Sequence, residues 1–224
     1  MRLKTLFSVV LISYTMHSSA TLTTESEKLS YSLGSRLAEH IKKFEDISPE
    51  ALSMGIMDVL NDQKLLLPPE EIQQLIQNAS LENEQQKHQL KEDKARSRLE
   101  KSHAFLSENS KASGVITLQS GLQYKILNEG DGPKPEDSDT VLVYYEGRLL
   151  NGSVFDSSYE RKQPASLKLN QVITGWTEGL QKMSLGSIWE LYIPPHLAYG
   201  TKGLPGYIGP NEALTFRVEL KEIL

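Results

Sequence analysis

The sequence predicts an α+β protein. A C-terminal antiparallel β-sheet wraps around one short helix, and an all-α region and a long connecting helix precede it. Three observations predict this class. Leucines recur at every fourth position near the N-terminus, as on one face of a helix. Residues 70–111 contain neither proline nor glycine. Several short stretches between residues 122 and 220 alternate apolar and polar residues, as half-buried strands do.

Residues 1–20 are predicted to form a cleavable signal peptide. Arg2 and Lys4 precede a mostly apolar stretch over 5–16, and the small residues 18–20 suit cleavage by a signal peptidase. The apolar stretch is too short to cross a hydrocarbon core of ~30 Å. A buried N-terminal helix is the alternative. Export implies a periplasmic mature protein without a transmembrane segment, with the outer membrane and the medium as alternative destinations.

Residues 21–66 are predicted to form a helical dimerisation domain. The first helix is marked by Leu29, Leu33, Leu37 and Ile41. A second helix begins at Pro49. Two helices this short cannot bury enough apolar surface on their own. Pairing with a second copy of the chain would cover them, and Met54 and Met57 are adaptable residues for such an interface. The alternative is that the two helices fold back on the C-terminal domain.

Residues 67–112 are predicted to form a long connecting helix. The Pro-Pro-Glu-Glu sequence at 68–71 suits a first turn, because the carboxylates lie where the helix dipole favours negative charge. A helix of ~40 residues is ~60 Å long. Apolar residues become sparse after Ile76, so a continuous coiled-coil interface is not supported. The helix is therefore expected to be largely solvated.

Residues 113–224 are predicted to form the sheet domain. Alternating apolar residues mark strands at 122–126, 141–145 and 214–220, and 187–193 is a further candidate. Asn151-Gly152 predicts a tight hairpin turn. Between the strands, residues 174–183 carry Trp176, Leu180 and Met183 at helical spacing. This segment is the short helix around which the sheet is expected to wrap.

Composition and motifs exclude several classes of function. The net charge of −5 provides no basic field for a nucleic-acid backbone, so no nucleic-acid partner is expected. The chain has no cysteine, which removes disulfides and thiolate chemistry. The histidines do not have metal-ligand spacing, and nucleotide-binding and nucleophile motifs are lacking. We therefore expect neither a metal nor a cofactor.

The C-terminal third is unusually rich in aromatic residues at strand ends, at turns and at the start of the short helix. They are Tyr145, Phe155, Trp176, Tyr199, Tyr207 and Phe216. One carboxylate, Asp156, directly follows Phe155. Taken alone, these residues fit a binding cleft and the core of a small domain about equally well.

At these residues the sequence resembles the FKBP-type prolyl isomerases. The stretches that carry the resemblance, in family order and spacing, are 143–147 (VYYEG), 154–158 (VFDSS), 172–179 (VITGWTEG), 198–200 (AYG) and 214–220 (LTFRVEL). The N-terminal half extends the resemblance to the macrophage infectivity potentiator (Mip) and FkpA group of Gram-negative bacteria, through 28–34 (KLSYSLG), 49–51 (PEA) and 120–125 (SGLQYK). The resemblance thus spans the predicted mature chain.

The resemblance implies a function and a set of partners. The implied activity is peptidyl-prolyl cis–trans isomerisation of exported proteins by non-covalent stabilisation of the twisted amide, accompanied by chaperone activity. The implied partners are proline-containing polypeptides, macrolide inhibitors and a second copy of the chain. The implied homodimer is V-shaped, joined by its N-terminal helices, with a long helix holding each catalytic domain apart. Two alternatives stay open: a chaperone or adhesin that only binds through the same cleft, and an unrelated structural protein.

The resemblance also implies which residues form the site. The catalytic residues carried over are Tyr145, Phe155, Asp156, Ile173, Trp176, Tyr199 and Phe216, and the substrate-binding residues are Arg161, Val172, Tyr207 and Ile208. In this scheme Trp176 receives the proline ring, the Ile173 amide and the Tyr199 hydroxyl bind the peptide, and Asp156 orients the carbonyl of the rotating bond. The chain departs from small family members at the rim, at Ala165, Gln171, Leu204 and Tyr207. These departures bear on ligand preference more than on the reaction.

Overall fold

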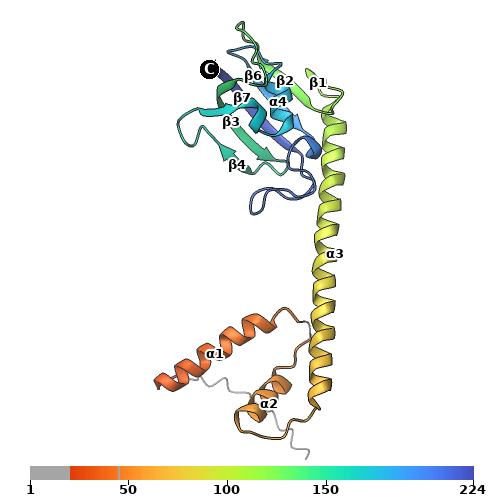
Figure 1. The fold of residues 1–224 in the computed structure, drawn as a ribbon, viewed down its shortest axis with the longest axis vertical. Helices are drawn as coiled ribbons and strands as arrows, with labels where there is room; N and C mark the ends of the chain where they lie inside the picture. The colour runs from red at the N-terminus through yellow and green to blue at the C-terminus, as the bar shows by residue number, and fades with distance from the viewer. Residues whose placement is uncertain (1–20, 45) are drawn as a thin grey trace, which may run out of the picture. The chain divides into compact units, whose positions relative to one another are not determined.

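The computed structural model describes residues 21–44 and 46–224 (Figure 1). The predicted signal peptide lies outside the described residues. The chain divides into two compact units, one ending at Glu84 and one running from Gln85 to Leu224. Among the described residues, no helix combines the length and the apolar character that crossing a bilayer requires.

The first unit contains the two short helices that the sequence predicts. Helix α1 spans Glu25–Ile41 and helix α2 spans Pro49–Leu60. Thr24 caps α1, because its Oγ1 accepts a hydrogen bond from the Glu27 amide (3.1 Å), while the Glu27 carboxylate accepts one from the Thr24 amide (2.8 Å). Ser48 caps α2 by a single bond, because its Oγ accepts a hydrogen bond from the Ala51 amide (3.2 Å). These caps explain why both helices begin where they do.

Helix α3 spans Pro69–Asn109 and belongs to both units. Most of the helix is exposed, as expected of a largely solvated helix, but its last turns also carry buried side chains. Ser102 is completely buried and Leu106 is nearly so. The Gln123 side chain donates a hydrogen bond to the Leu106 carbonyl and accepts one from Asn109, both at 2.8 Å. The predicted domain boundary at residue 113 therefore separates groups that contact one another.

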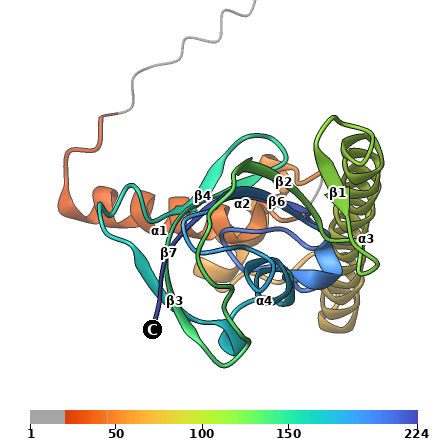
Figure 2. The ribbon, with the colours of Figure 1, turned by 90° about the horizontal axis from the view of Figure 1, so that it is seen from above.

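The second unit is built on an antiparallel sheet. Its described strands are β1 (Val115–Thr117), β2 (Gln123–Asn128), β3 (Thr140–Leu149), β4 (Val154–Ser157), β5 (Ala165–Lys168), β6 (Ile188–Ile193) and β7 (Leu214–Ile223). They lie in the order β1-β2-β6-β7-β3-β4, and β5 pairs with β3. Helix α4 (Thr174–Leu180) lies within the curve of the sheet, as the view from above shows (Figure 2). The predicted α+β fold is confirmed.

Helix α4 packs on the sheet at short range because it presents glycines there. A Cβ on Gly175 would lie 2.5 Å from the Ile193 side chain, and one on Gly179 would lie 3.1 Å from Leu191. Since both partners are in β6, these glycines set how closely the helix approaches the sheet. The same approach buries Leu180 and, one turn earlier on the same face of the helix, holds Trp176 against neighbouring aromatic rings.

Candidate active site

A cleft of about 450 Å³ opens beside α4. Its lining comes from β3, β4, β5, β7, the start of α4 and the loop before β7. The lining residues are Tyr145, Phe155, Asp156, Leu167, Gln171, Val172, Ile173, Trp176, Tyr199 and Phe216. A larger groove of about 590 Å³ runs between the last turns of α3 and residues 194–201. We take the smaller cleft as the candidate site, because it holds an aromatic cluster and a carboxylate with a shifted pKa.

Four aromatic rings form the floor and walls of the cleft. Trp176 is in edge contact with Tyr145 (ring centroids 5.1 Å apart, 90°) and with Phe216 (5.2 Å, 86°). Phe155 meets Phe216 in the same way (5.5 Å, 87°). Edge-to-face pairs of this kind are favourable beyond the area they bury. The Trp176 indole nitrogen is buried without an acceptor among the described residues, so packing holds the ring in place.

Strand periodicity explains how these rings converge. Tyr145 follows Val141 and Val143 on the inward face of β3, and Phe216 lies between Leu214 and Val218 on the inward face of β7. The register pairs Gly147 of β3 with Phe216 of β7 and with Asp156 of β4. Gly147 therefore leaves the space into which the rings of Phe155 and Phe216 pack.

Replacing Gly147 by alanine should destabilise this unit. A Cβ there would lie 2.7 Å from an atom of each of the Phe155 and Phe216 rings, and forcing extra volume into a packed site costs about 1–3 kcal/mol. Urea unfolding followed by tryptophan fluorescence measures the loss, since both tryptophans of the chain lie in this unit. The control is Gly34→Ala in α1, where a Cβ has nothing within 4 Å. Equal midpoints for wild type and Gly147→Ala would contradict the packing argument.

A polar group stands at one wall of the cleft. Asp156 accepts a hydrogen bond from the Tyr145 hydroxyl and another from Arg161 (2.6 Å), and Arg161 also donates to the Tyr145 hydroxyl oxygen (2.9 Å). Burial alone would raise the pKa of Asp156, but these hydrogen bonds and the guanidinium charge outweigh it, and the pKa lies below its ordinary value. Burial is the largest cause that raises the pKa of Tyr145, and the hydrogen bond to Asp156 is the second. Asp156 is therefore a carboxylate at neutral pH.

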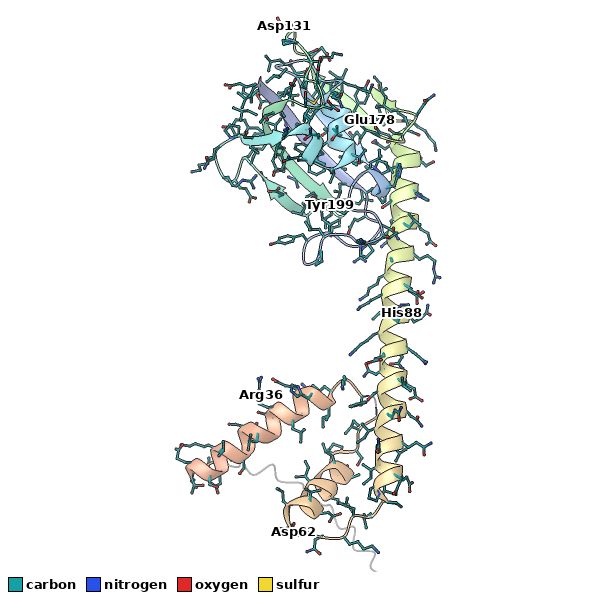
Figure 3. All side chains as sticks on the ribbon, viewed as in Figure 1. Arg36, Asp62, His88, Asp131, Glu178 and Tyr199 are labelled. Carbon is teal, nitrogen blue, oxygen red and sulfur yellow. The ribbon has the colours of Figure 1, made fainter. Side chains whose placement is uncertain are left out.

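Two hydrogen-bond donors in the cleft are free to bind a ligand. Ile173 precedes α4 in an extended conformation (φ −61°, ψ 146°), and no described residue accepts a hydrogen bond from its amide. Tyr199, labelled in Figure 3, follows the 3₁₀ turn Pro195–Leu197, and its hydroxyl likewise has no partner among the described residues. Burial and the nearby charge of Asp156 raise the pKa of Tyr199, so its hydroxyl keeps its proton.

The structure brings most of the predicted site residues together. Those that line the cleft are Tyr145, Phe155, Asp156, Val172, Ile173, Trp176, Tyr199 and Phe216. Arg161 does not line it but contacts two residues that do. Tyr207 and Ile208 do not line it either. Ile208 is buried in the core, and Tyr207 is 66% exposed and borders a different cavity with Arg98 and Glu212.

Two lining residues were not among the predicted site residues. Leu167 lies in β5, a strand of only four residues whose pattern is too short to stand out in the sequence. Gln171 was noted only as a departure from small family members. The alternation of Ala165 and Leu167, which are the less exposed residues of β5, is the signal that could have found Leu167. Within residues 21–44 and 46–224, no cluster of acidic and histidine side chains forms a metal site.

The chain matches two family models. The model described as FKBP-type peptidyl-prolyl cis-trans isomerase matches residues 132–221. The model described as the domain amino terminal to FKBP-type peptidyl-prolyl isomerase matches residues 26–126. Together they span both compact units.

Relatives match over most of their length. The peptidyl-prolyl cis-trans isomerase Mip of Coxiella burnetii is 45% identical over 212 residues, covering 94% of this chain and 92% of the relative. The outer membrane protein MIP of Legionella longbeachae is 42% identical, covering 89% and 86%. The crystal structure of FkpA from Escherichia coli is 34% identical with a TM-score of 0.75, covering 91% of this chain and 98% of that one. The chain therefore belongs to the FKBP-type peptidyl-prolyl cis–trans isomerases.

Proposed function

We propose that the aromatic cleft is the site at which this isomerase binds a prolyl peptide and turns its X–Pro bond. The observation that carries the proposal is the set of edge-to-face rings around Trp176, with the carboxylate of Asp156 at one wall. The cleft is apolar at its floor and polar at its edge. A proline ring suits the floor, and the flanking peptide groups suit the edge.

The reaction needs no covalent step. Rotation about an X–Pro bond has a barrier of ~18–20 kcal/mol, because turning the bond removes amide resonance. The twisted amide is less polar along its C–N bond than the planar amide. A site that binds the twisted form more tightly than either planar form therefore accelerates the exchange. An acceleration of ~10⁴-fold requires ~5–6 kcal/mol of differential binding.

The cleft contains the groups that this differential binding needs. Trp176 forms the floor on which the proline ring rests, and burial there removes water from the rotating bond. The free amide of Ile173 donates to the carbonyl that follows proline, and Tyr199 donates to the peptide. Asp156 holds the Tyr145 hydroxyl and Arg161 in place beside the carbonyl of the rotating bond. One or two hydrogen bonds and desolvation together supply energies of the required size.

Removing the Tyr199 hydroxyl should slow the enzyme while leaving the fold intact. A neutral hydrogen bond contributes about 0.5–1.5 kcal/mol, so Tyr199→Phe is expected to lower kcat/KM on a prolyl tetrapeptide roughly 2–10-fold. The matched control is Tyr144→Phe, because Tyr144 stacks on Tyr159 outside the cleft. Wild-type kcat/KM in correctly folded Tyr199→Phe would remove Tyr199 from the site.

The rate of isomerisation should be nearly independent of pH between about pH 5 and about pH 9. The lowered pKa of Asp156 keeps it ionised, and the raised pKa values of Tyr145 and Tyr199 keep both hydroxyls protonated. The depressed Asp156 pKa also stabilises the fold above about pH 3.9, and this contribution is lost as the pH falls below that value. Two-dimensional exchange NMR on a prolyl peptide measures the rate. A bell-shaped profile within this range would mean that a titrating group takes part.

We also propose that the protein is a periplasmic homodimer joined through α1 and α2. No described side chain of either helix is buried, and large apolar residues such as Leu33 (64% exposed) and Met57 (54% exposed) face outward. Exposed apolar surface of this extent favours association.

The signal-like sequence of residues 1–20 and the relative named as an outer membrane protein in Legionella longbeachae support a place outside the cytoplasm.

A further inference from the structure

Tyr199 lies in a segment that depends on other elements for its position. We call residues 198–213, which join the turn Pro195–Leu197 to β7, the Tyr199 loop. Gly200, Gly203 and Gly206 have positive φ angles within it, and so does Asn211 (φ 60°). A connecting segment of this kind carries function only where a rigid scaffold positions it.

Ser102 of α3 holds the end of this loop. Its side chain is completely buried. The Ser102 hydroxyl donates to the Asn211 carbonyl (2.9 Å) and accepts from the Ala213 amide (2.8 Å). Ala213 is itself completely buried, so water cannot replace a lost bond there. One hydroxyl thus satisfies two backbone groups on either side of Glu212.

Hydrogen bonds continue from this point to Tyr199. The Asn211 amide donates to the Gly200 carbonyl (2.8 Å), and the Gly203 amide donates to the Tyr199 carbonyl (3.1 Å). The Asn211 side chain donates to the Ala95 carbonyl (3.3 Å), about two helical turns before Ser102. Asparagine tolerates the left-handed conformation that this arrangement requires. The loop is therefore hydrogen-bonded to α3 at Asn211, the residue whose amide donates to Gly200.

Arg98 gives the loop a second contact with α3. Its Nε lies 3.5 Å from a carboxylate oxygen of Glu212, and that carboxylate accepts a hydrogen bond from the Gly209 amide (3.1 Å). A Cβ on Gly209 would collide with the Arg98 side chain. The loop is thus fitted to the surface of α3 over both Ser102 and Arg98.

We propose that Ser102 is a positioning residue for isomerisation: it fixes the Tyr199 loop against α3 and thereby places the Tyr199 hydroxyl on the substrate. The inference rests on the proposed function, because it takes Tyr199 to contact the peptide. Ser102 does not line the cleft and borders a separate cavity of about 470 Å³. Its effect on the reaction therefore passes through the loop.

The test uses the full chain. Ser102→Ala is expected to lower kcat/KM on a prolyl tetrapeptide by no more than Tyr199→Phe does, roughly 2–10-fold, because two backbone groups of the loop, one of them buried, lose their partner. Ser102→Thr keeps the hydroxyl, and the neighbouring cavity leaves room for its methyl group, so it should restore most of the rate. The matched control is Ser107→Ala, an exposed serine on the same helix, which should equal wild type. Unchanged kcat/KM in Ser102→Ala would overturn the proposal.

Hydrogen exchange separates positioning from general destabilisation. In Ser102→Ala, amides of residues 198–213 should exchange faster, while those of β3 and β4 should keep wild-type rates. Faster exchange across the whole unit, or lost activity with an unchanged loop, would overturn the proposal. The effects of Ser102→Ala and Tyr199→Phe on kcat/KM should be coupled, so that the double variant keeps a higher kcat/KM than the product of the two single losses predicts. The effects of Ser102→Ala and Asp156→Asn on kcat/KM should simply multiply. Wild-type kcat/KM in Tyr199→Phe would instead refute the proposed role of Tyr199 and leave the hydrogen-exchange result for Ser102→Ala standing.

Discussion

Replacing Asp156 by alanine is expected to lower kcat/KM on a prolyl tetrapeptide about 10–100-fold. Asp156 accepts from the Tyr145 hydroxyl and from Arg161, so its removal frees two side chains at the wall of the cleft. Hydrogen bonds to charged groups contribute about 1.5–3 kcal/mol, which corresponds to this range of rates. The contacts of Phe216 with Trp176 and with Phe155 do not involve Asp156 or its partners, so the fold should persist.

Two further variants define what the loss means. Asp156→Asn keeps the size of the side chain and removes its charge, so a similar loss would assign the effect to the carboxylate. Glu160→Ala removes an exposed carboxylate nearby and should leave the rate unchanged. Full activity in folded Asp156→Ala would refute the role given to this residue. The same variant tests the predicted chaperone activity, because suppression of aggregation that is independent of the cleft should survive it.

A charged residue on the outer face of α1 is expected to convert the protein from dimer to monomer. Leu33 is 64% exposed and stands in line with Leu29 and Leu37, so Leu33→Glu would place a charge within the proposed interface. Burying an unpaired charge is strongly unfavourable. Sedimentation velocity should show a monomer that retains its activity on short peptides, since the cleft belongs to the other unit.

The control for this experiment is Ser35→Glu. Ser35 is exposed on the same helix, but two residues from Leu33 it faces another direction. This variant should stay dimeric. A Leu33→Glu protein that sediments as a dimer would place the interface elsewhere. A wild-type protein that sediments as a monomer would contradict the dimer itself.

The fold could be predicted from the sequence wherever a local pattern decides the structure. The leucine period placed α1, proline start signals placed α2 and the start of α3, and alternation placed β2, β3, β6 and β7. Strands β1, β4 and β5 were not predicted, because three or four residues are too few to show a period. The burial of Ser102 within the otherwise largely exposed α3 was missed for a different reason. Ser102 is buried by contacts 109 residues away in sequence, which no local pattern records.

The candidate site could be predicted only through the family resemblance. Aromatic residues alone fitted a core and a cleft equally well, and the structure shows that Trp176 and Phe216 belong to both, since they are buried and line the cleft. Tyr207 illustrates the opposite failure. It lies in a loop whose path is set by glycines with positive φ and by contacts with α3, and its ring is exposed. Residue type did not reveal that placement.

The most direct test of the account is the cis–trans exchange rate of a model prolyl peptide, measured by exchange NMR without a coupling protease. The account predicts that catalytic amounts of the purified protein speed the exchange by orders of magnitude, and that Asp156→Ala, with an intact fold, loses most of this effect. An exchange rate that stays at the spontaneous value, tens of seconds or longer at 25 °C, would contradict it.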